Sequence, residues 1–174
     1  LKEKLEPSGQ GLYSLREEFK GALTKDAPQV FNYDIKFIIT GEISSIYKKN
    51  GRVRKVHNLI VLPGLEEAER LSKRLEKIGN LHSDGRPILG LDSHDLLEIS
   101  LEECPEVLFI PAHIWTPHFS LFGANSGFDS IEECFEDLVP NIYALETGLS
   151  SDPEMNWCLS ALDEFTLISN SDAR

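Results

Sequence analysis

Short apolar runs and amphipathic stretches alternate along the chain, and their spacing predicts its elements. The polar residues 1–25 predict helix with a break at residues 7–9. The run from Asp34 to Thr40 is rich in β-branched and aromatic side chains, which indicates a buried strand. Residues 43–62 predict a β-hairpin, because the Asn50-Gly51 pair tolerates the positive φ angles of a two-residue turn.

The rest of the chain alternates between predicted helices and strands. Apolar residues recur with helical spacing over 64–78, and Ser93 and Ser130 are suited to cap helices that run to about Glu103 and Leu138. A loop over 79–90, a helix over 154–162, and strands over 107–111, 142–145 and 165–168 complete the prediction. This order is typical of an α/β domain with parallel crossovers. Because the units are too few for a closed eight-fold barrel, we expect one domain over 1–174 with an incomplete barrel or an open sheet.

Residues with metal-binding side chains stand where the predicted strands end. Glu42, His113, Glu146 and Asp172 each follow an apolar run closely. The carboxyl ends of strands carry the active site in parallel α/β folds, so these four residues predict the floor of a site. A lone His or Glu is more often structural than functional, and the four together leave the two interpretations balanced.

The hairpin register adds a fifth candidate, His57. A two-residue turn at Asn50-Gly51 puts Glu42 opposite Leu59, so His57 shares the face of Glu42 as a diagonal neighbour about 7–8 Å away. A bulge near Ser44 would change this register. Imidazole and carboxylate together, without thiolate, suit zinc, manganese or iron.

Composition narrows the classes of function. The net charge of −12 argues against a purely electrostatic coat for nucleic acid, but carboxylates that ligate metals are compatible with a nuclease. Cys104, Cys134 and Cys158 are far apart and form no CxxC pair, which predicts reduced thiols in a cytoplasmic protein rather than a thiolate zinc site. No apolar run approaches the length that spans a bilayer, so we expect no membrane association.

Positive charge gathers around the predicted turn, in an otherwise acidic chain. The five residues are Lys48, Lys49, Arg52, Arg54 and Lys55. They predict either a finger that contacts DNA phosphates or a solvated hairpin tip protected by edge charges.

Two further residues are candidates for contact with DNA. Trp115, followed by Phe119 and Phe122, either stacks on an extruded base or packs beneath its loop. Arg86 either holds a phosphate or forms an internal ion pair with Asp84 or Asp92.

Several longer strings are specific enough to compare with a known family. They are Thr40-Gly-Glu-Ile-Ser-Ser-Ile-Tyr-Lys-Lys, Val53-Arg-Lys-Val-His-Asn-Leu-Ile, Gly79-Asn-Leu-His-Ser-Asp-Gly-Arg-Pro-Ile-Leu-Gly-Leu-Asp, Pro111-Ala-His-Ile-Trp-Thr-Pro, Phe119-Ser-Leu-Phe-Gly, Ser126-Gly-Phe-Asp-Ser-Ile-Glu-Glu-Cys-Phe, Ala144-Leu-Glu-Thr-Gly-Leu-Ser-Ser-Asp-Pro and Ser169-Asn-Ser-Asp-Ala. Over nearly all of residues 35–173 the chain resembles the endonuclease Q branch of the polymerase-and-histidinol-phosphatase (PHP) family.

The resemblance implies a fold, an activity and a set of ligands. The implied fold is an incomplete, distorted (β/α) barrel of PHP type, with the hairpin at 43–62. The implied activity is cleavage of DNA beside deaminated bases or abasic sites, with two or more divalent ions, zinc or manganese. By the resemblance, Glu42 matches a bridging glutamate, His57 and His113 match histidine ligands, and Asp172 matches a late aspartate ligand; these four would be the catalytic residues.

The chain also departs from the family pattern. The opening Asp-x-His-x-His motif, a later Asp-x-x-His and the family's cysteine zinc element are not found in it, and Arg174 stands where the family has histidine. We therefore expect a domain fragment without the N-terminal metal motifs and the C-terminal region, which by itself does not cut DNA. The alternatives are a small-molecule phosphoesterase of the same family and a non-catalytic DNA-binding or scaffold module.

Overall fold

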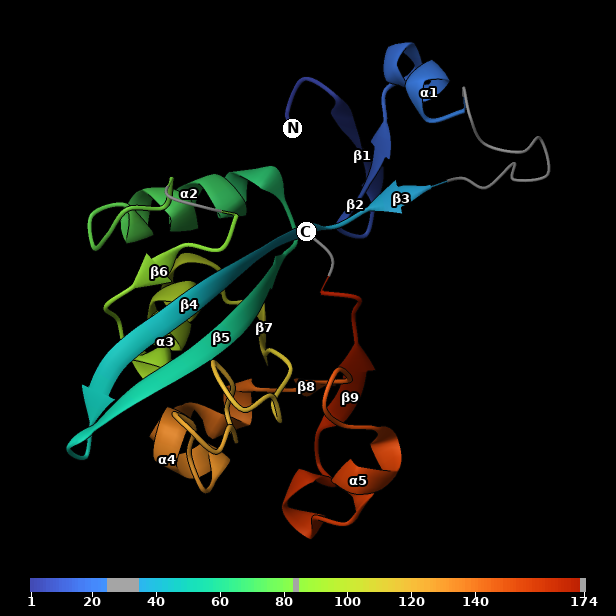
Figure 1. Ribbon diagram of the computed structural model, residues 1–174. Coiled ribbons are helices and arrows are strands. Elements are labelled where there is room, and N and C mark those ends of the chain that lie inside the picture. The colour runs from blue at the N-terminus through green and yellow to red at the C-terminus, as the bar shows by residue number, and fades with distance from the viewer. Residues whose placement is uncertain (25–34, 83–84, 173–174) are drawn as a thin grey trace.

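The computed structural model describes residues 1–24, 35–82 and 85–172 (Figure 1). Asp34, Asp84 and Arg174, to which the sequence analysis assigned roles, lie outside these described residues. Within the described ranges no helix combines the length and the apolar character needed to cross a membrane. The three cysteines are free thiols, as their spacing predicted.

A long antiparallel hairpin forms the centre of the molecule (Figure 1). Strand β4 (Ile39–Lys49) pairs with β5 (Arg52–Leu62) in an unbroken register, in which Lys49 faces Arg52 and Glu42 faces Leu59. The turn residues Asn50 and Gly51 have φ angles of 52° and 75°, the left-handed region that such a turn requires. The predicted hairpin is confirmed, without a bulge and with both strands complete.

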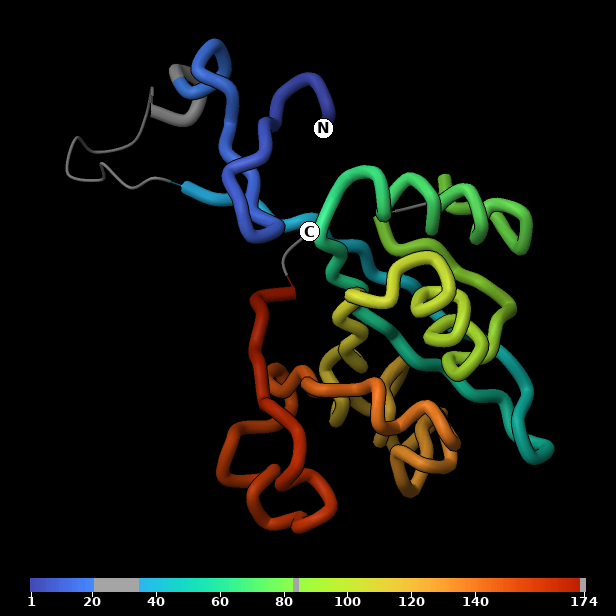
Figure 2. Tube along the Cα trace, turned by 180° about the vertical axis from the view of Figure 1, so that it is seen from behind, coloured from blue at the N-terminus to red at the C-terminus, as the bar shows by residue number. Residues whose placement is uncertain are grey.

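Two short strands extend this hairpin into a four-stranded sheet, and two helices cover one face of it. Strand β6 (Ile88–Leu89) runs parallel to β4, and β7 (Leu108–Pro111) runs antiparallel to β5. Helices α2 (Leu65–Leu75) and α3 (Ser93–Glu103) lie nearer to the viewer than the sheet in Figure 2, which shows the molecule from behind. Their buried leucines, Leu71, Leu75, Leu96 and Leu97, belong to the hydrophobic core.

A second unit of parallel strands follows β7. After α4 (Ile131–Phe135) and the 3₁₀ turn η1 (Glu136–Asn141), strand β8 (Ala144–Thr147) pairs in parallel with β9 (Thr166–Ser169). Helix α5 (Pro153–Trp157) and the 3₁₀ turn η2 (Ser160–Leu162) connect these two strands. A backbone hydrogen bond of 2.9 Å from Ile114 N to Glu146 O ties this unit to the chain that leaves β7.

The first residues do not form the predicted helix. Strands β1 (Leu5–Gly9) and β2 (Leu12–Leu15) form a hairpin that β3 (Lys36–Phe37) extends, and only α1 (Glu17–Thr24) is helical. The reason lies in the turn, where Gly9, Gln10 and Gly11 all have positive φ angles that a right-handed helix excludes. The strand predicted over residues 34–40 is divided between β3 and the start of β4 and is buried only in part: Ile39 is buried, whereas more than half of Ile35 and of Ile38 is exposed.

The predicted (β/α) barrel is wrong. The sheets are separate, the longest strands are antiparallel, and among the described residues only β4–β6 and β8–β9 pair in parallel. A parallel barrel needs a long crossover between successive strands, whereas the two-residue turn at Asn50-Gly51 forces β5 to return antiparallel.

The helix caps are partly as predicted. Ser130 accepts a hydrogen bond from Glu133 N (3.3 Å), as expected, although α4 ends at Phe135 and continues only as 3₁₀ turn. Helix α3 is capped by Asp92 rather than by Ser93. Ser93 is buried instead and accepts from the amide of Asn58 at 3.2 Å, which ties α3 to β5.

We predict that Phe109→Ala lowers the free energy of unfolding by roughly 3–5 kcal/mol, because it empties a fully buried site. Phe109 has no exposed surface and meets Phe135 edge-on, with ring centroids 5.9 Å apart. Urea denaturation measures the change. The matched control, Tyr143→Ala, removes an aromatic ring that is 61% exposed and should stay within about 0.5 kcal/mol of the wild type. Equal effects of the two substitutions would contradict the assignment of Phe109 to the core.

Candidate metal centre

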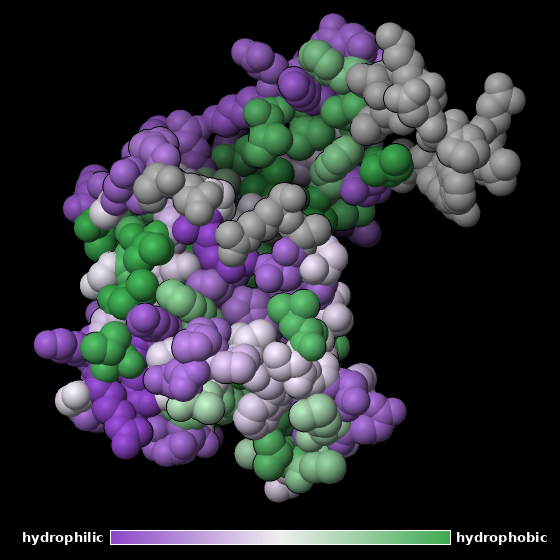
Figure 3. Space-filling model, viewed as in Figure 1, coloured by the Kyte–Doolittle hydropathy of each residue, from purple (hydrophilic) through white to green (hydrophobic). Residues whose placement is uncertain are grey.

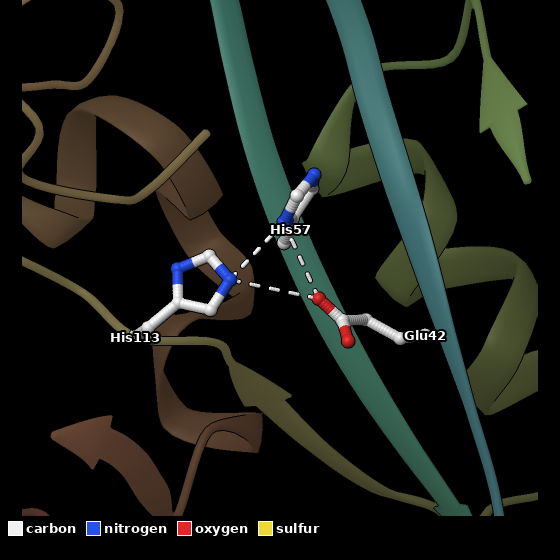
Figure 4. Close-up of side chains that lie close together, drawn as sticks. All are labelled: Glu42, His57 and His113. Atoms are coloured by element: carbon white, nitrogen blue, oxygen red, sulfur yellow. Dashed lines mark hydrogen bonds and ion pairs between the residues drawn. The ribbon is translucent and has the colours of Figure 1, made fainter. Parts of the chain in front are cut away.

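Three side chains from three elements converge at the middle of the central sheet (Figure 4). Glu42 comes from β4, His57 from β5, and His113 from the loop after β7. His57 Nδ1 lies 3.3 Å from Glu42 Oε1 and 3.1 Å from His113 Nε2, and His113 Nε2 lies 3.6 Å from Glu42 Oε1. Both imidazole rings are buried.

The hairpin register explains why these residues meet. Glu42 and His57 are diagonal neighbours on one face, as predicted. Strand β7 lies along the other edge of β5, with Pro111 paired to Asn58, so the chain delivers His113 beside His57 two residues later. The predicted convergence of the three residues is confirmed, and their role as metal ligands stays a prediction.

The spacing of the three atoms fits a single ion. Bonds of about 2.0–2.1 Å in a tetrahedral zinc site place neighbouring ligand atoms roughly 3.3–3.4 Å apart. The three distances here, 3.1, 3.3 and 3.6 Å, scatter around that value. Donor type and spacing are therefore both compatible with zinc or a similar divalent ion.

The hydrogen bonds around the rings determine where their lone pairs lie. The hydroxyl of Thr116 has the carbonyls of His118 (2.9 Å) and His113 (3.2 Å) as acceptors and lies 3.0 Å from His113 Nδ1. In the tautomer in which the hydroxyl donates to a carbonyl, His113 Nδ1 donates to the hydroxyl. His113 Nε2 then carries a lone pair. His57 Nδ1 lies 3.1 Å from Arg86 Nη1, which can only donate, so this nitrogen carries a lone pair as well.

The result is a cluster of acceptors that lacks a proton of its own. The two imidazole nitrogens face the buried carboxylate oxygen Glu42 Oε1, which also lies 2.9 Å from Arg86 Nε. Acceptors held this close together repel one another unless a cation lies among them. The cluster is therefore compatible with a bound cation.

Further residues hold His113 in place. Its φ angle of 33° is rare for a non-glycine residue, and its backbone N–H donates to Glu146 Oε2 at 2.8 Å. The other oxygen of the buried Glu146 accepts from Asn170 Nδ2 at 2.7 Å. Glu146, which the sequence placed at the floor of the site, therefore positions His113 rather than joining the three close ligand atoms.

Phe119 supports His57 in a similar way. The two rings stack with centroids 4.8 Å apart and an interplanar angle of 29°. The carbonyl of Phe119 also accepts from His57 N at 3.0 Å. Neither the stacking of Phe119 nor the contact of Thr116 could be predicted from the sequence, which shows only that apolar and hydroxyl residues follow His113.

Arg86 lies deeper in the site than its sequence context indicated. Its Nε lies 2.9 Å from Glu42 Oε1 and its Nη2 lies 2.6 Å from Asp172 Oδ1, with only 11% of the side chain exposed. Asp172 thus reaches the cluster through Arg86. Of the alternative partners, Asp92 instead pairs with Lys49, and Asp84 lies outside the described residues.

The environment shifts the proton affinities of the cluster. Burial, helped by the positive charge of Arg86, lowers the pKa of His57 to about 3. Burial alone would raise the pKa of Glu42, but the neighbouring His113 and Arg86 outweigh it and lower that pKa. At neutral pH the cluster therefore contains a carboxylate and a neutral His57.

A cavity of about 700 Å³ opens beside the cluster. Glu42, Arg86 and Asp172 are among its polar lining residues. Its apolar lining consists of Ile38, Leu59, Val61, Leu108, Ile110 and Ile168. The volume is within the range of known small-molecule sites.

The basic residues of the hairpin separate into two groups. Lys48 and Arg52 are exposed at the tip, which is strongly hydrophilic (Figure 3). Arg54 is buried, donates to the carbonyl of Gly127 and lies over the Phe128 ring.

Lys49 and Lys55 are also engaged with the fold. Lys49 pairs with Glu136 at 2.7 Å and with Asp92 at 3.4 Å. Lys55 lies 5.2 Å from the centre of the Phe119 ring. Contact of the five residues with DNA stays a prediction, and Lys48 and Arg52 are placed best for it.

Trp115 connects its loop to α5. The indole nitrogen donates to Asn156 Oδ1 at 2.9 Å, and the ring packs on Phe122 with centroids 4.8 Å apart. This arrangement corresponds to the packing alternative. Stacking of Trp115 on a base stays a prediction.

Comparison with known proteins gives one similar sequence. The chain is 35% identical over 124 residues to the uncharacterized protein YqxK of Bacillus subtilis (strain 168). The aligned region is 68% of this chain but spans only 29% of the length of YqxK. No family model and no solved structure matches the chain.

We predict that His57 in the metal-free protein stays neutral down to about pH 4. The unfolded chain takes up a proton near pH 6.5 and the folded chain only near pH 3, so stability falls as the pH falls through this window. By pH 4 the wild type should lose up to about 3 kcal/mol more than His57→Gln does. NMR titration of the ring protons and urea denaturation at each pH measure both effects. A midpoint near 6.5 for His57 would contradict the burial of its neutral form.

Proposed function

We propose that this chain belongs to a divalent-metal-dependent phosphodiesterase of the endonuclease Q type, which cleaves DNA beside deaminated bases or abasic sites. The observation that carries the proposal is the cluster of Glu42, His57 and His113, whose three acceptor atoms have the spacing of ligands around one ion. The proposal does not depend on a barrel, because the ligands are placed by the local β4–β5–β7 register.

The residues of the chain have distinct parts in this proposal. Glu42 Oε1, His57 Nδ1 and His113 Nε2 would hold the ion, and Asp172 contacts this cluster through Arg86. The ion would activate a water molecule and neutralise charge on the phosphoryl group. Thr116 and Glu146 orient His113, and the ring of Phe119 keeps water from one face of His57.

The proposal that the substrate is DNA is supported by the family resemblance and by the basic residues of the hairpin tip, and not by the cluster. The long strings shared with the endonuclease Q branch imply damaged DNA, and the exposed Lys48 and Arg52 supply local positive charge in a chain of net charge −12. Phosphate contacts from such side chains would position the duplex without selecting a sequence.

A small-molecule phosphoesterase is the second candidate. It is favoured by the engagement of Lys49 and Arg54 inside the fold and by the cavity of about 700 Å³ beside the cluster. Hydrolysis of p-nitrophenyl phosphate without cleavage of DNA would favour this candidate over the first.

We predict that the chain binds one zinc or manganese ion, and that His113→Ala weakens binding by at least about 100-fold, because a direct ligand is removed. Isothermal titration measures the affinity. His118→Ala is the matched control, since His118 is exposed in the same loop, and it should bind like the wild type. Equal affinity of the wild type and His113→Ala would contradict the site.

DNA cleavage is tested in parallel assays of the longest protein that the gene encodes and of the 174-residue chain. Duplexes that carry uracil, hypoxanthine or an abasic site should be nicked by the gene product with manganese or zinc, and not after His113→Ala. The chain alone should not nick them, because the family resemblance assigns further ligands to motifs that it does not contain. Metal binding without nicking of any damaged duplex by the gene product would sink the endonuclease proposal.

We predict that Lys48→Gln with Arg52→Gln weakens binding to all duplexes alike. The slope of log affinity against log salt should flatten by roughly one unit for each phosphate that the hairpin tip no longer neutralises. Fluorescence anisotropy at several salt concentrations measures this slope. Arg74→Gln with Lys77→Gln on and just after α2 removes the same charge elsewhere and should leave the slope unchanged. Equal slopes in all three proteins would mean that the hairpin tip does not contact DNA.

A further inference from the structure

The guanidinium group of Arg86 contacts Glu42 and His57, two of the three residues proposed to hold a metal ion, and it also contacts Asp172. Its Nε lies 2.9 Å from Glu42 Oε1, its Nη1 lies 3.1 Å from His57 Nδ1, and its Nη2 lies 2.6 Å from Asp172 Oδ1. Three of its nitrogens thus point at three groups that would serve as ligands. The side chain is 11% exposed, so these contacts are made largely away from bulk water.

Stereochemistry makes the two cations mutually exclusive at His57. A neutral imidazole nitrogen without a proton carries one lone pair in the plane of the ring. His57 Nδ1 directs this lone pair either to Arg86 Nη1 or to a metal ion, and it cannot serve both. Binding of an ion therefore requires that Arg86 give up this hydrogen bond.

Charge leads to the same conclusion. With neutral imidazoles, Glu42 and Asp172 contribute two negative charges and Arg86 one positive charge. A divalent ion at the centre of Glu42, His57 and His113 would lie within a few ångströms of the guanidinium, in a setting that screens charge weakly. The guanidinium and the ion then repel each other, and the carboxylates are freed for the ion when Arg86 moves away.

We propose that Arg86 is an internal counter-cation that exchanges with the metal ion. Arg86 holds Glu42, His57 and Asp172 together, and an ion that binds at the cluster would displace it from the first two. The exchange has two effects: it lowers the affinity for the ion, and it turns the guanidinium into the neighbouring cavity, where its paired N–H groups can bind a phosphate. This inference rests on the proposed metal site and adds a positioning role for Arg86 to it.

The exchange is tested by titrating zinc into the metal-free chain and measuring the heat of binding. Arg86→Gln should bind zinc about tenfold more tightly than the wild type, because no internal cation has to leave. Arg74→Gln on α2 also removes one positive charge, but from a partly exposed pair with Glu102, and should bind zinc like the wild type. This control separates exchange at the site from a general effect of net charge.

A second measurement uses the wild type itself and so does not depend on the folding of Arg86→Gln. The Nε–H signal of Arg86, assigned by through-bond NMR from its backbone, should shift and exchange faster with water when zinc is added. The Nε–H signal of Arg74 should not change.

The outcomes are distinguishable. Zinc binding by the wild type that is equal to or tighter than that of Arg86→Gln would overturn the exchange and leave the metal site standing. An Nε–H signal of Arg86 whose chemical shift and exchange rate do not change when zinc binds would also overturn the exchange. Zinc binding by neither protein would overturn the proposed metal site and the exchange with it.

Discussion

The antiparallel ladder between β4 and β5 fixes every part of the candidate metal centre. It places Glu42 diagonally to His57 and supplies the edge along which β7 delivers His113. A shift of one residue in this ladder would turn Glu42 and His57 to opposite faces and remove the cluster. The two-residue turn at Asn50-Gly51 has no extra residues that could accommodate such a shift. The geometry of the site therefore depends on a turn at the far end of the hairpin.

The ladder is held in register by more than its own hydrogen bonds. Asn58, next to His57, is fully buried and donates to Ser45 on β4 and to Ser93 on α3. The amide nitrogen of Asn58 reaches both hydroxyls only in this arrangement of the two strands and the helix. The core behind the sheet and the cluster in front of it are thus coupled through adjacent residues of β5.

The sequence predicts local geometry where a short motif determines the backbone conformation. The Asn50-Gly51 turn gives the register of the hairpin, and from it the pairing of Glu42 with His57 follows. The overall topology could not be predicted in this way, since the parallel barrel was inferred from the order of elements and from resemblance, and neither reports how β5 and β7 pair. The place of Arg86 depends on a fold that brings residue 86 and Asp172 together across the chain. The interior position of Arg54 was equally hidden, because a charged residue at a hairpin is expected to face solvent until its partners, Gly127 and Phe128, are known.

The left-handed backbone of His113 has a consequence for how this position evolves. Glycine, which has no Cβ, adopts this conformation without cost, whereas the imidazole of His113 is held here against a conformational preference. Selection for thermal stability alone would draw residue 113 toward glycine, which keeps the hydrogen bond from its backbone N–H to Glu146 but has no side chain to offer the cluster. Directed evolution of a more heat-resistant variant would therefore have to be screened for retained ligand chemistry at each round, because at this residue the two goals point to different amino acids.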